Sequence, residues 1–145
     1  MLERSKARRQ ALHILYQREV TGERTARILS ERSYSTEEGE PVEYARALTL
    51  GVEAHLADLD DRLETISENW SVARMPLVDR NILRLAAYEI LFGEDVPPSV
   101  AINEAVELAK VFGGNDSSKF VNGVLGRLAE TFATESRGEG TEEGG

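Results

Sequence analysis

Apolar residues recur along most of this chain with the spacing of an α-helix, and no other feature constrains the fold as strongly. Residues 4–20 give the clearest example, because Ala7, Ala11, Ile14 and Leu15 fall on one arc of a helix. No segment shows a convincing alternation of apolar and polar residues, which is typical of a half-buried strand. The sequence therefore predicts an all-α fold.

Polar stretches rich in proline, glycine or serine separate the periodic segments, and the resulting pattern predicts six or seven helices. The expected helices cover about residues 4–20, 25–32, 42–57, 59–70, 76–92, 99–112 and 116–132. Asp58 is expected to mark the break between the third and fourth of them. The helix over 76–92 is apolar over much of its circumference, which predicts that it is the most buried element. The apolar stripe of the fourth helix ends at Trp70, so this side chain is expected in the core.

The chain has the size and composition of one domain, with 145 residues and no cysteine. The lack of cysteine excludes a disulfide scaffold and thiolate metal sites, and two histidines are too few for a typical histidine zinc site. No apolar run is long enough to span a bilayer and no signal peptide is visible, so we expect a cytoplasmic protein without a membrane segment. The domain is expected over residues 1–132. Residues 133–145 are acidic and rich in glycine and glutamate, which predicts a disordered tail.

Charge is distributed unevenly along the chain. Residues 1–20 hold five cations and two carboxylates, a net charge of +3, whereas the remaining residues hold 12 cations and 24 anions. A basic arm, residues 1–10, thus precedes an acidic body. This arrangement favours a local site for a polyanion on a protein that otherwise repels polyanions. A simple solvated helix end is the alternative.

The residues that enzymes commonly use do not form a recognisable catalytic pattern in this sequence. We find no dinucleotide-binding glycine motif, no Walker loop, no metalloprotease motif and no nucleophile elbow. Residues 113–119 resemble a phosphate loop only superficially, because the Gly-Lys-Ser/Thr ending is missing. We therefore expect neither an enzyme nor a bound metal or cofactor.

The first expected helix carries a polar strip opposite its apolar arc. Lys6, Arg9, His13 and Tyr16 share this strip, since their spacing is i, i+3, i+7 and i+10. Arginine forms forked hydrogen bonds to phosphate, and tyrosine or histidine can stack on an unpaired base. The strip therefore favours binding of single-stranded RNA. The alternative is a protein–protein adaptor or homodimer in which a partner covers this helix, including Tyr16 and Val20.

Three stretches of the chain resemble the NusB family of transcription antitermination factors. They are RRQALHILYQ at residues 8–17, VDRNILRLAAYEIL at 78–91 and VPPSVAINEAVELAKVFGGNDSSKFVNGVL at 96–125. The resemblance covers roughly residues 4–130, and its last two motifs are long and specific.

The resemblance implies two packed helical subdomains and a non-catalytic function. It implies binding to the boxA element of nascent RNA, especially ribosomal RNA leaders. It also implies a heterodimer with NusE, a small-subunit ribosomal protein, and entry into the antitermination complex on RNA polymerase. The basic arm is thinner here than in many members of the family, which implies weaker binding to RNA alone and more dependence on the partner.

The resemblance also assigns roles to individual residues of this chain. RNA contacts are expected from the basic arm and first helix, from the start of the fifth helix and from the start of the last helix. The residues concerned are Arg4, Lys6, Arg8, Arg9, Tyr16, Asp79, Arg80, Asp116, Lys119 and Phe120, to which the helical strip adds His13. A surface for the protein partner is expected on the fifth and sixth helices, around Arg84, Glu89 and Glu107.

Overall fold

The computed structural model describes residues 2–35, 37–67 and 70–144 of the chain. Over these ranges it is entirely helical, with seven α-helices, one short 3-10 helix and no strand. The elements are α1 (Leu2–Thr21), α2 (Thr25–Glu31), α3 (Glu43–Ala54), α4 (Leu56–Ser67), η1 (Val72–Arg74), α5 (Leu77–Phe92), α6 (Pro98–Phe112) and α7 (Ser117–Gly144). The prediction of an all-α fold is confirmed. None of these helices is both long and apolar enough to cross a membrane.

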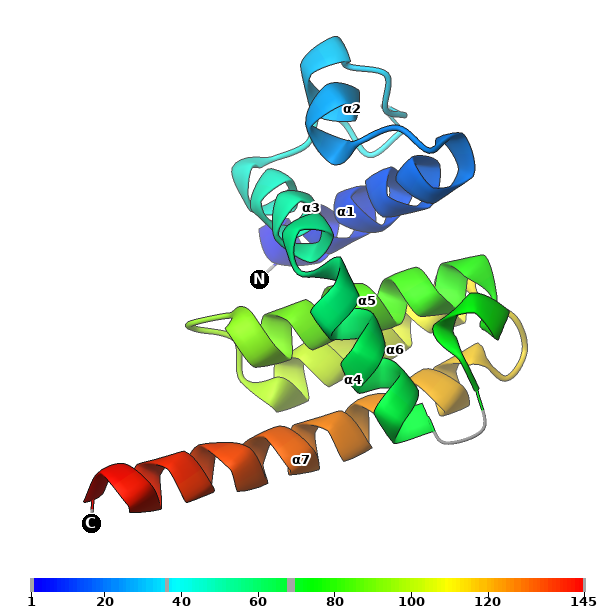
Figure 1. Ribbon diagram of the computed structural model, residues 1–145. Coiled ribbons are helices and arrows are strands. Elements are labelled where there is room, and N and C mark those ends of the chain that lie inside the picture. The colour runs from blue at the N-terminus through cyan, green and yellow to red at the C-terminus, as the bar shows by residue number, and fades with distance from the viewer. Residues whose placement is uncertain (1, 36, 68–69, 145) are drawn as a thin grey trace.

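The helices form two packed groups, α1–α3 above and α4–α7 below in the view of Figure 1. Helix α5 lies where the groups meet and contacts α1, α3, α4, α6 and α7. Ile82, Leu83 and Leu85 are among its fully buried side chains. Each side chain of this size contributes about 1.5–3 kcal/mol when it is withdrawn from water. The prediction that this helix is the most buried one is consistent with these contacts.

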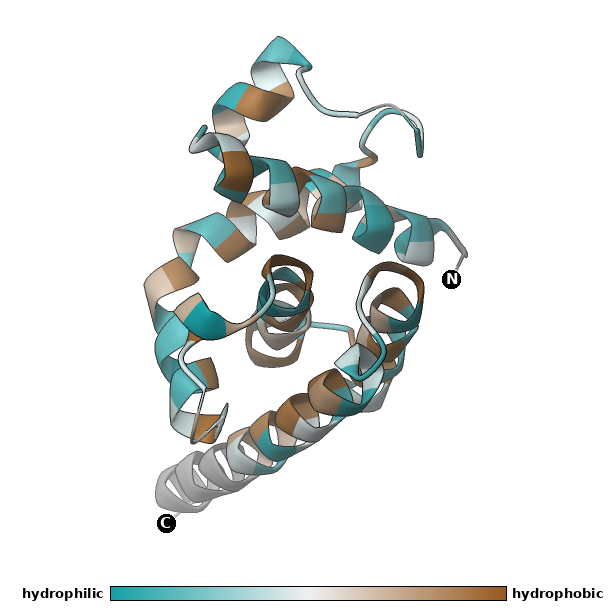
Figure 2. Cartoon of the chain, turned by 90° about the vertical axis from the view of Figure 1, so that its right-hand side faces the viewer, coloured by the Kyte–Doolittle hydropathy of each residue, from teal (hydrophilic) through white to brown (hydrophobic). Residues whose placement is uncertain are grey.

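The helices are amphipathic, and Figure 2 shows hydrophobic and hydrophilic residues alternating around them. One large hydrophobic core joins α1 and α3 to α4–α7. A second, smaller cluster lies between α1, α2 and the segment after α2, and consists of Ile14, Ile28, Leu29 and Tyr34. Helix α1 therefore has apolar neighbours on both sides, which leaves only a narrow part of its surface for solvent.

The structure corrects two expectations about the middle of the chain. The break between α3 and α4 falls at His55 rather than at Asp58. Trp70 is not a core residue, because half of it is exposed. Helix α4 ends at Ser67, so the helical spacing that placed Trp70 on the apolar stripe no longer applies at residue 70.

Helix α7 extends beyond Phe132, where the sequence predicts its end. Its backbone is helical through Gly144 and thus through most of the stretch expected as a disordered tail. That stretch holds four glycines and no bulky apolar residue. This composition supplies little packing energy to hold a helix in water, so disorder of residues 133–145 in solution remains a prediction.

Glu53 of α3 joins three elements of the upper group. Its carboxylate accepts hydrogen bonds from Arg18 Nε of α1 at 2.6 Å and from the Thr25 amide of α2 at 3.1 Å. Burial by itself raises the pKa of Glu53, but these hydrogen bonds and the Arg18 charge outweigh it and lower the pKa below its usual value. The ionised carboxylate therefore stabilises the fold above the unfolded-state pKa of about 4.3.

We expect Glu53→Gln to lower the free energy of unfolding by about 1 kcal/mol at neutral pH. The difference from the wild type should vanish as the pH falls through the lowered pKa, since the wild-type carboxyl is then also neutral. Urea denaturation at neutral and acidic pH measures this, with Glu23→Gln as the control in an exposed pair with Arg27. An equal difference at both pH values would refute the assignment.

Candidate nucleic-acid interface

Four side chains of α1 form what we call the α1 strip: Lys6, Arg9, His13 and Tyr16. The Lys6 side chain lies over Gly39, and Arg9 Nε donates to the Glu38 carboxylate at 3.1 Å. Tyr16 is 43% exposed. The strip therefore lies beside the segment that leads into α3, with its cations and its tyrosine at the surface.

His13 connects the α1 strip to α6. Its ring meets the Phe112 ring edge to face, with the ring centroids 5.3 Å apart. Phe112 is the last residue of α6 and precedes the turn that leads into α7. Figure 1 shows this turn at the same end of the molecule as the last residues of α1 and the first residues of α5. Segments far apart in the sequence thus meet at this end.

Arg4 lies near the beginning of α1 in an exposed ion pair. Its guanidinium donates to both carboxylate oxygens of Asp95, at 3.1 and 3.3 Å, and lies 4.4 Å from the centre of the Tyr44 ring. The hydrogen bond and the charge of Arg4 lower the pKa of Asp95. Exposed pairs of this kind contribute about 0–1 kcal/mol, so an RNA phosphate can replace Asp95 at little cost.

Arg8 has a different environment from the other cations of the arm, because it is 3% exposed. Its Nε and Nη2 each donate to the Glu89 carboxylate at 2.9 Å, and its Nη1 donates to Glu104 at 3.1 Å. The Tyr44 hydroxyl donates a short hydrogen bond to the Glu89 carboxylate. The expected phosphate contact by Arg8 therefore does not fit the structure, since the guanidinium is already satisfied in the interior.

Burial of the Tyr44 phenol and its hydrogen bond to Glu89 both raise the pKa of Tyr44 above its usual range. The phenol therefore stays protonated and remains a hydrogen-bond donor. Arg8, Glu89 and Tyr44 form a buried network that joins α1, α3 and α5.

The two residues expected at the start of α5 also have structural partners. Asp79 is 4% exposed, and its Oδ1 accepts a hydrogen bond from the Ser117 hydroxyl at 2.7 Å. The Ser117 oxygen in turn accepts from the Gly114 amide at 2.8 Å, so Asp79 fixes the turn between α6 and α7. Arg80 lies 2.9 Å from the Glu19 carboxylate of α1. Asp79 therefore positions the interface rather than presenting its charge to solvent.

Two of the three residues expected on the partner surface are buried. Arg84 donates to Asp60 at 2.8 and 2.9 Å and to Glu19 at 2.7 Å, while Glu89 holds Arg8. Both side chains are occupied within the chain and cannot reach a partner surface in this conformation. Glu107 is exposed, 3.8 Å from Lys110 on the same helix, and remains a candidate for partner contact.

The start of α7 presents a cation and an aromatic ring. Asp116 and Lys119 are exposed, and the half-buried Phe120 ring lies 6.1 Å from the Trp70 ring. Sequence reasoning missed Trp70 as a surface residue. The sequence pattern extends the fourth helix to residue 70, and only an earlier end of that helix would have placed Trp70 at the surface.

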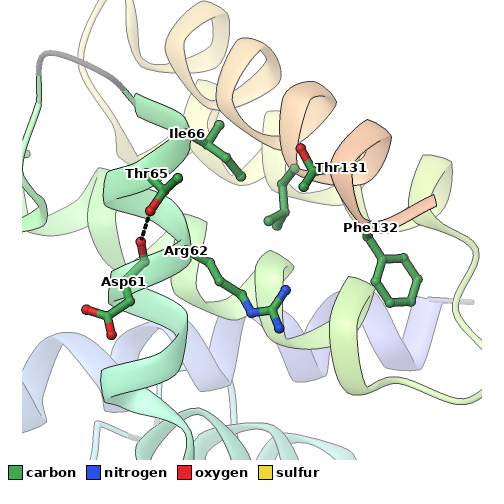
Figure 3. A pocket seen from close by; sticks show the side chains of 7 residues that line it. Asp61, Arg62, Thr65, Ile66, Thr131 and Phe132 are labelled. Atoms are coloured by element: carbon green, nitrogen blue, oxygen red, sulfur yellow. Dashed lines mark hydrogen bonds between the residues drawn. The ribbon is translucent and has the colours of Figure 1, made fainter. Parts of the chain in front are cut away.

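A hollow lies apart from these residues, between α4 and α7 (Figure 3). It has a volume of about 330 Å³ and includes apolar side chains of both helices, Ile66, Leu128 and Phe132. The polar residues at its edge are Asp61, Arg62, Thr65 and Thr131. The Thr65 hydroxyl donates to the Asp61 backbone carbonyl at 2.9 Å. None of the expected RNA-binding residues lines this hollow.

The α1 strip and the start of α7 together offer cations for phosphates and rings for unpaired bases. Within the part of the chain that the structure describes, no group of three or more acidic or histidine side chains could hold a metal ion. The cations and rings of the α1 strip and the start of α7 are suited to binding an extended polyanion with exposed bases.

The family pattern and the most similar curated proteins point to the same family. The NusB family pattern matches residues 5–130. The chain is 50% identical over 125 residues to the transcription antitermination protein NusB of Rubrobacter xylanophilus, covering 86% of this chain and 88% of that protein. It is 44% identical over 133 residues to NusB of Desulfitobacterium hafniense, covering 90% of each.

Solved structures share the fold. The structure of T. maritima NusB has a TM-score of 0.78 and 38% sequence identity, covering 94% of this chain and 96% of that one. A crystal structure of antitermination factors NusB and NusE in complex with double-stranded RNA contains a chain with a TM-score of 0.74 and 28% identity. The match covers 90% of this chain and 98% of that one.

Proposed function

This chain belongs to the NusB family, and from that membership we propose that it is a non-catalytic antitermination factor that binds single-stranded boxA-type RNA together with NusE. The RNA is the leader of a ribosomal transcript, and the complex joins the antitermination assembly on RNA polymerase. The observation that carries the proposal is the contact between His13 and Phe112. This contact places the α1 strip beside the turn that leads to Lys119 and Phe120.

The side chains at this face favour single-stranded RNA over a duplex. Tyr16 and Phe120 are aromatic and at least partly exposed, and such rings stack on bases that are not paired. Lys6 makes no ion pair with another described residue, whereas Arg4 and Arg9 are each held by one carboxylate at the surface. These pairs reduce the charge offered to RNA, which supports dependence on NusE for tight binding.

The salt dependence of binding tests which cations hold the RNA. Because Arg8 is buried, the cations that remain for phosphate contacts are Arg4, Lys6, Arg9 and Lys119. Log affinity should therefore decrease with log salt at a slope of about −3. We expect Lys6→Ala with Lys119→Ala to bring the slope to about −1.5, since two contacts are lost. Fluorescence anisotropy of labelled boxA-type RNA across a salt series, with NusE present, measures both slopes.

Arg27→Ala is the matched control, because Arg27 is exposed on α2 and pairs with Glu31 of the same helix rather than belonging to the α1 strip. Its slope should equal that of the wild type. A slope unchanged by the double substitution would show that the phosphates lie elsewhere on the molecule.

A second candidate function is a protein–protein adaptor or homodimer in which α1 is covered by another subunit. The exposed side chains of Tyr16 (43%) and Val20 (60%) favour it, because they lie four residues apart on α1 and so share a face that a second subunit could cover. Mass measured against protein concentration distinguishes the two. Self-association without retention of RNA would support the adaptor and contradict the RNA-binding proposal.

A further inference from the structure

Trp70 is an unusual surface residue. It precedes η1, half of it is exposed, and its ring is inclined by 56° against Phe120 of α7. Tryptophan is highly buried on average, since its large ring gains much from leaving water. An exposed ring held by a second ring is typical of a site that another molecule completes.

Trp70 and Phe120 form one side of a groove, which we call the Trp70 groove. Pro76, Asp79, Asp116 and Ser117 complete its lining, and its volume is about 410 Å³. This volume falls within the range of about 300–1,000 Å³ found for small-molecule sites. The two rings already touch, with centroids 6.1 Å apart, so a flat ligand would stack on the open face of Trp70 rather than enter between them.

The charges of the groove select the kind of ligand. Asp116 is an exposed carboxylate, which repels a phosphate and accepts hydrogen bonds from N–H groups, whereas the buried Asp79 carboxylate already accepts from Ser117. The amino and imino groups of nucleobases are N–H donors. Lys119 is exposed one residue before Phe120, where it can take the phosphate of the same nucleotide. An unpaired base therefore fits the groove better than an anion.

We propose that the Trp70 groove holds one unpaired base of the bound RNA, stacked on Trp70 and flanked by Phe120. The inference rests on the proposed function and extends it by a further binding residue. Each of the four bases carries an N–H donor on its Watson–Crick edge, so the Asp116 carboxylate can accept a hydrogen bond from the base held there.

Substitution of Trp70 tests the inference directly. Trp70→Ala should weaken binding of boxA-type RNA in the presence of NusE by about 5- to 150-fold, the effect of losing one stacked base. Trp70→Phe should retain most of the affinity, because it keeps a ring. Leu50→Ala, which truncates an exposed side chain on α3, serves as the control and should bind as the wild type does.

The chain contains a single tryptophan, so its fluorescence reports on this groove alone once NusE has been subtracted. RNA should quench the Trp70 emission and shield it from iodide in the wild-type protein. Circular dichroism and thermal unfolding establish that Trp70→Ala is folded.

Three results would overturn the inference and separate it from the proposed function. Trp70→Ala could bind RNA as the wild type does while Lys6→Ala and Lys119→Ala weaken binding. This result would show that no base lies in the groove, and the proposed function would stand. Quenching by NusE but not by RNA would show that a protein occupies the groove. Failure of the wild type to bind RNA with NusE would overturn the function itself.

Discussion

Replacing Arg8 with Met lowers the free energy of unfolding by about 3–5 kcal/mol, although the side chain belongs to a basic arm. Glu89 is 1% exposed, and the substitution removes three hydrogen bonds to its carboxylate, which then keeps the Tyr44 hydroxyl but no cation among the described contacts. A buried charge without a partner is far more costly than a broken surface pair. Urea denaturation at neutral pH measures the loss.

Arg9→Met is the adjacent control. Arg9 is paired with Glu38 at the surface, and exposed pairs contribute about 0–1 kcal/mol. Similar stabilities of the two arginine variants would show that Arg8 is not a structural residue.

Replacing Arg84 with Met is the second substitution with a large expected effect, a loss of about 3 kcal/mol. Arg84 is 6% exposed and joins α5 to Asp60 of α4 and Glu19 of α1. Burial lowers the pKa of Arg84, but the hydrogen bonds and charges of these carboxylates outweigh burial and raise it, so the guanidinium stays charged. The expected loss lies at the lower end of the range because both carboxylates retain some contact with water.

Thermal unfolding and urea denaturation check the Arg84 prediction, with Arg27→Met as the control in an exposed pair with Glu31 on α2. The Arg84 variant should also lose affinity for RNA, because Glu19 and Arg80 lie where α1 meets α5. A variant as stable as the wild type would contradict the structural role of Arg84. Arg84 would then again be a candidate for contact with the protein partner.

The helical architecture could be predicted from the sequence because its signal is local. Apolar spacing within one helix, such as that of Ala7, Ala11 and Leu15, reports directly on which side faces the core. The break between α3 and α4 was misplaced because no glycine or proline lies within three residues of His55 to mark it. The predicted fourth helix was also too long, so Trp70 was assigned to its apolar stripe although α4 ends at Ser67.

The roles of Arg8 and Arg9 could not be separated by residue type. Both are arginines of one basic run, and the difference depends on Glu89, which is 81 residues away in the chain. A local signal did exist. Ala11, Leu12 and Leu15 lie three, four and seven residues after Arg8, so Arg8 borders the apolar arc and Arg9 does not. Only the tertiary structure shows that the buried Glu89 carboxylate is the partner of Arg8.

The affinity of boxA-type RNA for this protein, measured with and without NusE, tests the proposed RNA-binding function. We predict weak binding to the protein alone, and much tighter, sequence-dependent binding once NusE is present. We also predict that Tyr16→Ala reduces the affinity of the complex while leaving NusE bound. Equal affinity with and without NusE, or a stable complex with NusE that retains no RNA, would contradict the proposed function.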